Sequence, residues 1–250
     1  MGHSRMKAEL IDGKRIAGEV RSEVAGGVAE MQERLGIVPK LAVVLVGDDP
    51  ASAIYVASKQ KAATEAGMVT DDHKFPGDVT QEELLRQVRF LGEDDEVSGV
   101  LVQLPVPDHI DADVVIGALN PDKDVDGLHP TNVGLLLQGR ARFVPATPAG
   151  IQQLLLRTGN DPAGKHVVVC GRSEIVGKPV SLLLMQKKPG ANATVTICHS
   201  RTTDLGSITR QADILIAAMG QPRFITADMV KDEAVVIDVG TNRINATERK

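Results

Sequence analysis

Residues 167–184 read VVVCGRSEIVGKPVSLLL, an apolar run followed by a glycine-containing loop and a second apolar stretch. This order predicts a buried strand, a tight turn and a helix, and it places loop N–H groups and a helix N-terminus where they can bind a phosphate. Gly171 and Gly177 lie six positions apart, which matches neither the G-x-G-x-x-G fingerprint nor a P-loop, and Pro179 supplies no hydroxyl for magnesium. The motif therefore favours a nucleotide site of unusual spacing, while an ordinary strand–helix turn stays open at this point.

The next apolar run along the chain ends in TICHSRTTD, residues 196–204. A site for NAD carries an acidic residue near this point, because a carboxylate binds the ribose 2′-hydroxyl. Here His199, Ser200 and Arg201 take that place, and Arg172 is available from the first loop. Guanidinium groups bind phosphate in a bidentate manner, so this composition predicts NADP as the cofactor, although Arg201 taken alone could be a solvated loop arginine.

Five further runs are continuously apolar instead of alternating, and they cover residues 41–47, 98–105, 193–199, 212–220 and 234–240. Strands of this kind are covered on both faces, as in a parallel sheet with helices on either side. Helical segments lie between the runs, among them one that begins with a capping box at Thr80 and one with Pro148 near its start. The chain is therefore predicted to have an α/β fold.

A Gly- and Pro-rich segment at about residues 127–150 interrupts this alternation of strands and helices. We therefore expect two α/β lobes around a cleft, with residues 1–143 forming the first lobe and residues 144–250 the second. The second lobe is predicted to be a Rossmann-type NADP-binding domain built on a parallel sheet. Clefts between such lobes are common ligand sites, so the predicted cleft is the candidate active site.

The composition excludes several classes of function. A net charge of −5 and an aromatic content of 2% leave neither a basic surface nor stacking residues for nucleic acid. No apolar run approaches the roughly 18 residues of a membrane span. Cys170 and Cys198 each lie near the end of an apolar run, so both are expected to be buried strand residues of a cytoplasmic protein with reduced thiols.

Tyr55 is the only tyrosine of the chain, and Lys59 follows it four residues later on a segment of small residues. Asp49 and Pro50 predict the start of a helix here, so both side chains share one face. The pair alone is a weak signal, because a surface pair has the same spacing. Gln103, however, interrupts an apolar run at the end of a predicted buried strand, where a polar side chain is costly unless it is paired or serves a ligand.

Three aspartates alternate in NPDKDVDGLHP, residues 120–130, at positions 122, 124 and 126. An EF-hand loop that started at Asp122 would need a glutamate at its twelfth position, where Val133 stands. The spacing therefore argues against calcium, and we expect no metal site in this protein.

Seven motifs occur in order along nearly the whole chain, and they read YVASKQKAA, VQLPVP, PDKDVDGLHP, PATPAGI, VVVCGRSEIVGKP, ATVTICHSRT and VVIDVG. Together they resemble the bifunctional methylenetetrahydrofolate dehydrogenase/methenyltetrahydrofolate cyclohydrolase family. The resemblance implies that the first lobe binds tetrahydrofolate derivatives, that the second binds NADP, and that the protein is a homodimer. It also implies NADP-dependent oxidation of methylenetetrahydrofolate and hydrolysis of the methenyl product to formyltetrahydrofolate, in the one-carbon metabolism that supplies purine synthesis.

The resemblance also implies roles for single residues. Lys59 matches the catalytic lysine, which manages protons during hydration and ring opening, and Gln103 matches the glutamine that hydrogen-bonds this lysine. Tyr55 matches the tyrosine that packs against the folate, and Asp126 matches the acid that holds the amino edge of the pterin. The expected cofactor-binding positions are Gly171, Arg172, Ser173, Gly177, Ser200, Arg201 and Thr241.

The chain departs from the family pattern after DVGTN, residues 238–242. Members of the family continue with a strand, a Gly- and Pro-rich loop that borders both ligands, and a final helix, and this loop and helix are absent from these 250 residues. One alternative is therefore a folate- and NADP-binding protein of weak activity. Another is a different two-lobe dehydrogenase, such as one acting on shikimate or an amino acid.

Overall fold

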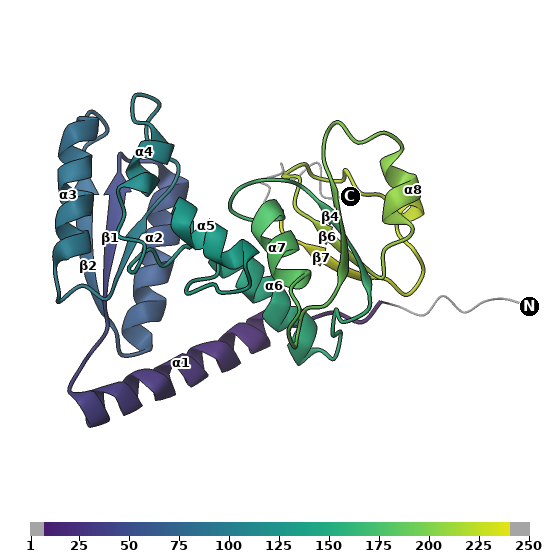
Figure 1. Cartoon of the computed structure of the whole chain (residues 1–250), viewed down its shortest axis with the longest axis horizontal. Coiled ribbons are helices and arrows are strands. Elements are labelled where there is room, and N and C mark those ends of the chain that lie inside the picture. Colours follow the sequence, from purple (N-terminus) through teal and green to yellow (C-terminus); the bar gives the residue numbers. More distant parts are fainter. Residues whose placement is uncertain (1–7, 241–250) are drawn as a thin grey trace, which may run out of the picture.

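The computed structural model of the chain describes residues 8–240 and contains two parallel β-sheets in two lobes (Figure 1). The first sheet has the order β2-β1-β3 and consists of β1 (Lys40–Val46), β2 (Val69–Phe75) and β3 (Gly99–Val102). The second has the order β5-β4-β6-β7 and consists of β4 (His166–Cys170), β5 (Thr194–Cys198), β6 (Ile214–Ala217) and β7 (Val235–Asp238). Neighbouring strands pair in parallel in both sheets, so the predicted α/β fold is confirmed.

Helices cover both faces of the first sheet. They are α3 (Gln81–Glu93) and α4 (Ala112–Gly117) on one face and α2 (Pro50–Glu65) on the other, and α1 (Gly13–Leu35) precedes β1. Side chains of β1 alternate between two cores, because Val44 packs with Leu84 and Val88 of α3 while Val43 packs with Val56 of α2. A strand that is buried on both faces needs apolar residues at successive positions, which explains the unbroken apolar run in the sequence.

The second sheet is also covered on both faces. The elements on one face are α6 (Ala146–Arg157) and α7 (Gly177–Leu184), and those on the other are α8 (Leu205–Thr209) and the 3-10 helix η1 (Ala227–Met229) with its flanking loops. Val167 and Val169 of β4 face the first pair of helices, and Val168 faces away from them. Cys170 and Cys198 lie in the same core as Val168 and are buried, free thiols, as the sequence predicted.

Three connections hold the two lobes in place. α1 runs along one side of the molecule from the second lobe to the first (Figure 1). Arg157 of α6 donates to both carboxylate oxygens of Glu23 in α1, at 2.8 and 2.7 Å. Between the lobes lies α5 (Pro130–Leu137), where the Leu136 carbonyl accepts a hydrogen bond from Gln186 Nε2 at 2.6 Å, just after α7. The domain boundary predicted at residues 143/144 falls in the loop between α5 and α6.

The sequence did not indicate β2, α1 or α5. β2 reads VTDDHKF, and its charged residues suit an edge strand that pairs on one side only. α1 contains several glycines and buries only Ile16 and Val28, so its apolar periodicity is weak. α5 lies in the segment that was expected to be a break, where Pro130 suits the first helical position and His129 Nδ1 accepts a hydrogen bond from Thr131 N–H. Among residues 8–240, no helix is both long and apolar enough to cross a membrane.

Candidate active site

The carboxyl ends of β1 and β3 bring Lys59 and Gln103 together. Lys59 lies on α2, which follows β1, and Gln103 comes directly after β3. The Gln103 N–H donates to the Val44 carbonyl at 2.8 Å, so the residue is fixed to the neighbouring strand. Lys59 Nζ donates to Gln103 Oε1 at 3.2 Å, and Gln103 Nε2 donates to the Leu104 carbonyl at 2.6 Å. The amide is therefore held with its oxygen directed at the lysine.

Tyr55 lies one helical turn before Lys59 on α2. The side of this helix that faces the sheet carries the buried residues Ser52 and Val56, whereas Tyr55 is 50% exposed. An aromatic ring in this position has an uncovered surface that can pack against a flat ligand.

Asp126 lies on the segment between α4 and α5, close enough to Lys59 for the two charges to interact. Burial raises the pKa of the Asp126 carboxyl above its ordinary value of 3.8, the Lys59 ammonium opposes this rise, and the Asp124 carboxylate adds to it. Gly127 follows with a φ of +64°, and a Cβ there would lie 3.2 Å from the Phe143 carbonyl oxygen. The turn that presents Asp126 therefore requires glycine.

In the second lobe, the glycine loop passes very close to neighbouring backbone. The Gly171 N–H donates to the Cys198 carbonyl at 2.8 Å, and a Cβ on Gly171 would lie 2.5 Å from the Ala218 carbonyl oxygen. A Cβ on Gly177 would lie 2.2 Å from the Gly171 carbonyl oxygen. Ser173 Oγ accepts a hydrogen bond from Gly177 N–H at 3.4 Å. Both glycines are therefore needed for the close approach of the loop, and Ser173, expected only to bind the cofactor, also orders the turn.

Arg172, Ser200 and Arg201 are exposed at the carboxyl edge of the second sheet. They follow β4 and β5, which pair in parallel, so their segments start from the same edge. Two guanidinium groups, a hydroxyl and the N-terminus of α7 are a donor set that fits a dinucleotide with an added 2′-phosphate. Thr241 lies outside the described residues.

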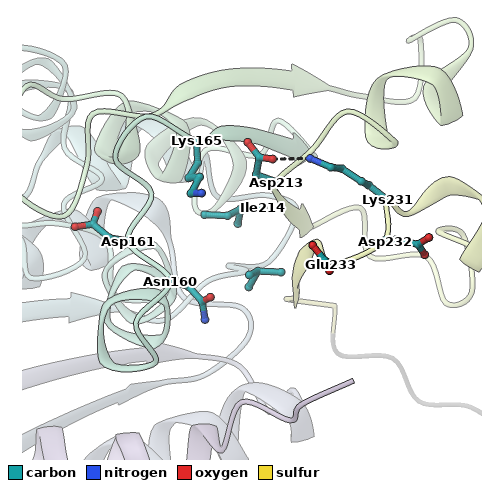
Figure 2. A pocket seen from close by; sticks show the side chains of 9 residues that line it. Asn160, Asp161, Lys165, Asp213, Ile214, Lys231, Asp232 and Glu233 are labelled. Atoms are coloured by element: carbon teal, nitrogen blue, oxygen red, sulfur yellow. Dashed lines mark hydrogen bonds and ion pairs between the residues drawn. The ribbon is translucent and has the colours of Figure 1, made fainter. Parts of the chain in front are cut away.

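Two cavities lie at opposite edges of the second sheet. One, of about 220 Å³, lies at the carboxyl edge of β6 and β7, where Ala217 and Asp238 line it. The other, of about 240 Å³, lies at the amino edge (Figure 2). There Lys231 donates to Asp213 at 2.7 Å, and this bond together with one from His166 N–H holds the pKa of Asp213 down to about 2. Of these two cavities, only the one lined by Ala217 and Asp238 lies at the edge of the sheet that carries the glycine loop.

These features define a class of protein, namely a two-lobe α/β enzyme in which one lobe accepts a phosphate-bearing dinucleotide and the other presents reactive polar side chains. The family model of the tetrahydrofolate dehydrogenase/cyclohydrolase catalytic domain matches residues 11–126, and the model of the NAD(P)-binding domain of the same family matches residues 145–250. The chain therefore belongs to the tetrahydrofolate dehydrogenase/cyclohydrolase family.

Individual relatives agree with this assignment. The bifunctional protein FolD of Dehalococcoides mccartyi (strain CBDB1) is 54% identical over 97% of this chain and 82% of its own length. Among solved structures, the FolD methylenetetrahydrofolate dehydrogenase/cyclohydrolase from Campylobacter jejuni is 42% identical, with a TM-score of 0.91 over 96% of this chain and 84% of that chain. The Trypanosoma brucei FolD, complexed with NADP cofactor and inhibitor, is 37% identical, with a TM-score of 0.90 over 98% and 83%.

The chain is accordingly a bifunctional, NADP-dependent methylenetetrahydrofolate dehydrogenase and methenyltetrahydrofolate cyclohydrolase of one-carbon metabolism. The alternative of a different two-lobe dehydrogenase is set aside by the two family matches.

The structure brings Lys59, Gln103 and Asp126 to one place, with Tyr55 on the same helix as the lysine. Their roles stay predictions. Sequence reasoning gave no role to Asp124 beyond a rejected calcium loop and did not consider Asn132, yet both are buried polar residues, each 1% exposed. The signal that pointed toward Asp124 was the alternation of aspartates, which does not show which of them faces inward.

Replacing Gly177 by alanine should distort the glycine loop, because the added methyl group has no space beside the Gly171 carbonyl. We expect a loss of about 1–3 kcal/mol in the free energy of unfolding and weaker NADP binding, measured by urea denaturation and calorimetric titration. Gly26→Ala is the control, because a Cβ there meets nothing within 4 Å; it should be neutral or stabilising by up to about 1 kcal/mol. A folded G177A that binds NADP as the wild type does would contradict this account.

Asp126→Asn should stabilise the ligand-free protein at neutral pH. The folded state raises the pKa of Asp126, so ionisation at higher pH costs folding free energy, and this cost disappears below the ordinary value of 3.8. The variant should therefore exceed the wild type in free energy of unfolding at pH 7, and the difference should shrink as the pH falls toward 4. Urea denaturation at a series of pH values measures the difference, and a gap that widens toward acid pH would be the opposite result.

Proposed function

We propose that this chain carries out both reactions at the one site formed by Lys59, Gln103, Tyr55 and Asp126. The observation that carries the proposal is the 3.2 Å hydrogen bond from Lys59 Nζ to Gln103 Oε1, made beside the partly buried Asp126 carboxylate. A lysine held by an amide oxygen and near a carboxylate is positioned to move protons at a fixed point in space.

Each side chain has one part in the proposed mechanism. Asp126 accepts two N–H bonds from the amino edge of the pterin, and the Tyr55 ring packs against the folate, so the one-carbon bridge lies near Lys59. NADP, when bound, accepts the hydride that leaves this bridge. Water then adds to the methenyl carbon, and one of its protons leaves to solvent as the positive charge of the substrate is lost. The Lys59 ammonium gives a proton to the ring nitrogen as the carbon–nitrogen bond opens, and Lys59 Nζ takes up the second proton of the added water as the formyl carbonyl forms. Gln103 Oε1 orients the amine throughout.

The cofactor is proposed to lie along the carboxyl edge of the second sheet. Gly171 and Gly177 allow the backbone of the loop to approach it, Ser173 and Ser200 supply hydroxyl groups, and the guanidinium groups of Arg172 and Arg201 bind the 2′-phosphate. Thr241 completes the proposed set. The support for this placement is the exposure of these side chains at one edge and the close packing of both glycines.

The test is an assay with methylenetetrahydrofolate and NADP that follows absorption of the methenyl product and its hydrolysis. Lys59→Met should slow hydrolysis by at least about a hundredfold, because the proton carrier is gone, so that the methenyl product accumulates. Lys61→Met is the matched control on the same helix, since Lys61 is 77% exposed and pairs only with Glu65 at 3.8 Å among the described residues; it should behave as the wild type. Hydrolysis that survives unchanged in K59M removes Lys59 from its role, and binding of both ligands without turnover in the wild type contradicts the proposed function.

We also propose that the enzyme is a homodimer that acts in the cytoplasm, where Cys170 and Cys198 stay reduced. Support for the dimer comes from Ile197, which is 44% exposed on the edge strand β5. Light scattering coupled to size exclusion should give twice the mass of one chain, and a monomer at assay concentrations contradicts the dimer. Cell fractionation tests the compartment.

A further inference from the structure

The segment that carries Asp126 is fixed by a buried carboxylate two residues earlier. Asp124 is 1% exposed, and its Oδ2 accepts hydrogen bonds from the His129 N–H at 2.8 Å and from Asn132 Nδ2 at 2.9 Å. Asn132, which lies on α5 and is also 1% exposed, donates in addition to the Pro121 carbonyl at 2.9 Å. One amide therefore holds both the start of the segment and the carboxylate in its middle.

The same segment is attached to the first sheet. The Val100 N–H of β3 donates to the Lys123 carbonyl at 2.7 Å, and Val100 and Asp124 form an isolated β-bridge. A Cβ on Gly99 would lie 2.3 Å from Val125 Cγ1, so the contact between strand and segment leaves no space for a side chain. The segment is thus clamped between β3 and α5, and Asp126 lies between Asp124 and His129, the two residues that one of these hydrogen bonds joins.

The buried carboxylate is not neutralised by the groups that bind it. Within residues 8–240, its donors are a backbone N–H and a side-chain amide, and both are uncharged. A buried negative charge with only neutral donors acts on other charges nearby, because the surroundings screen it poorly. In the part of the chain that the structure describes, the charged groups that act on Asp126 are Lys59 from α2 and Asp124 from its own segment, and Asp124 favours the protonated form of Asp126.

We propose that Asp124 is a positioning residue of the folate site, which clamps the segment of residues 121–129 so that Asp126 is held near Lys59 and whose negative charge opposes the charge of Asp126. This inference rests on the proposed role of Asp126 in holding the pterin. Asp124 itself does not touch the ligand. It would act in two separable ways, through the hydrogen bonds that fix the segment and through its charge.

Asp124→Asn separates the two actions. The asparagine Oδ1 can take the place of Oδ2 and keep both hydrogen bonds, while the negative charge is lost. Because Asp126 then ionises more readily, tetrahydrofolate binding should persist to lower pH than in the wild type. With affinities normalised at pH 8, D124N should bind about threefold more tightly than the wild type at pH 5, as measured by anaerobic calorimetry. Titration of the ligand itself is common to all variants and cancels in this comparison.

Asp122→Asn is the matched control, because it removes the same charge from the same segment at a solvent-exposed position, where Asp122 pairs with Arg142. Its pH profile should overlay that of the wild type. Asp124→Leu removes the clamp as well as the charge, and it should weaken tetrahydrofolate binding by about tenfold or more at every pH, since the donors of His129 and Asn132 lose their acceptor. NADP binding reports on folding in every variant and should stay within about twofold.

The outcomes are distinguishable from failure of the proposed function. If Asp126→Asn binds tetrahydrofolate as tightly as the wild type does, the role of Asp126 is wrong. Suppose that D126N loses binding, while the tetrahydrofolate affinity of D124N falls toward acid pH as that of the wild type does. The inference about the charge of Asp124 is then overturned. A folded D124L with unchanged tetrahydrofolate affinity overturns the clamp. Should D124L fail to bind NADP and so prove unfolded, the D124N profile still decides the inference.

Discussion

Parallel strands end at one edge of their sheet, and this constraint builds both halves of the candidate site. In the first sheet it places the residue after β3 beside the helix that follows β1, which is why Gln103 can reach Lys59 at 3.2 Å. In the second sheet it places the loops after β4 and β5 side by side, so that Arg172 and Arg201 share an edge. Strands β1, β3, β4 and β6 are largely buried on two faces, so the polar side chains of the candidate site lie at the strand ends.

Two carboxylates of the first lobe, those of Asp124 and Asp126, show how polar groups enter this framework. Asp126 is partly buried in a place that raises its pKa, and Asp124 is almost completely enclosed with neutral donors. Neither arrangement favours folding by itself, since buried charge loses hydration. The protein keeps them in a segment attached to β3 and α5, where the rigidity of the surrounding backbone holds groups that would otherwise move toward solvent.

The sequence was sufficient for the features that depend on local pattern. Unbroken apolar runs indicated the buried strands, the Thr80 capping box marked α3, and Gln103 stood out because a glutamine is unusual at the end of such a run. It was insufficient where tertiary contacts decide. β2 is polar because it lies at an edge, α1 buries only two side chains, and the inward direction of Asp124 depends on the position of Asn132 eight residues later. The proximity of Asp126 to Lys59 likewise follows from the fold and not from their separation in the chain.

The short helix α5 is attached at both ends, and this limits insertions and deletions within it. Near its start, Asn132 binds the segment that presents Asp126, and near its end the Leu136 carbonyl accepts a hydrogen bond from Gln186, just after α7. One residue more or less between these points would turn its ends relative to each other by about 100° and shift them by about 1.5 Å. Both attachments could not then be made together. The length of α5 is thus a fixed dimension of the molecule, because it sets the distance between an attachment to the first lobe and an attachment to the second.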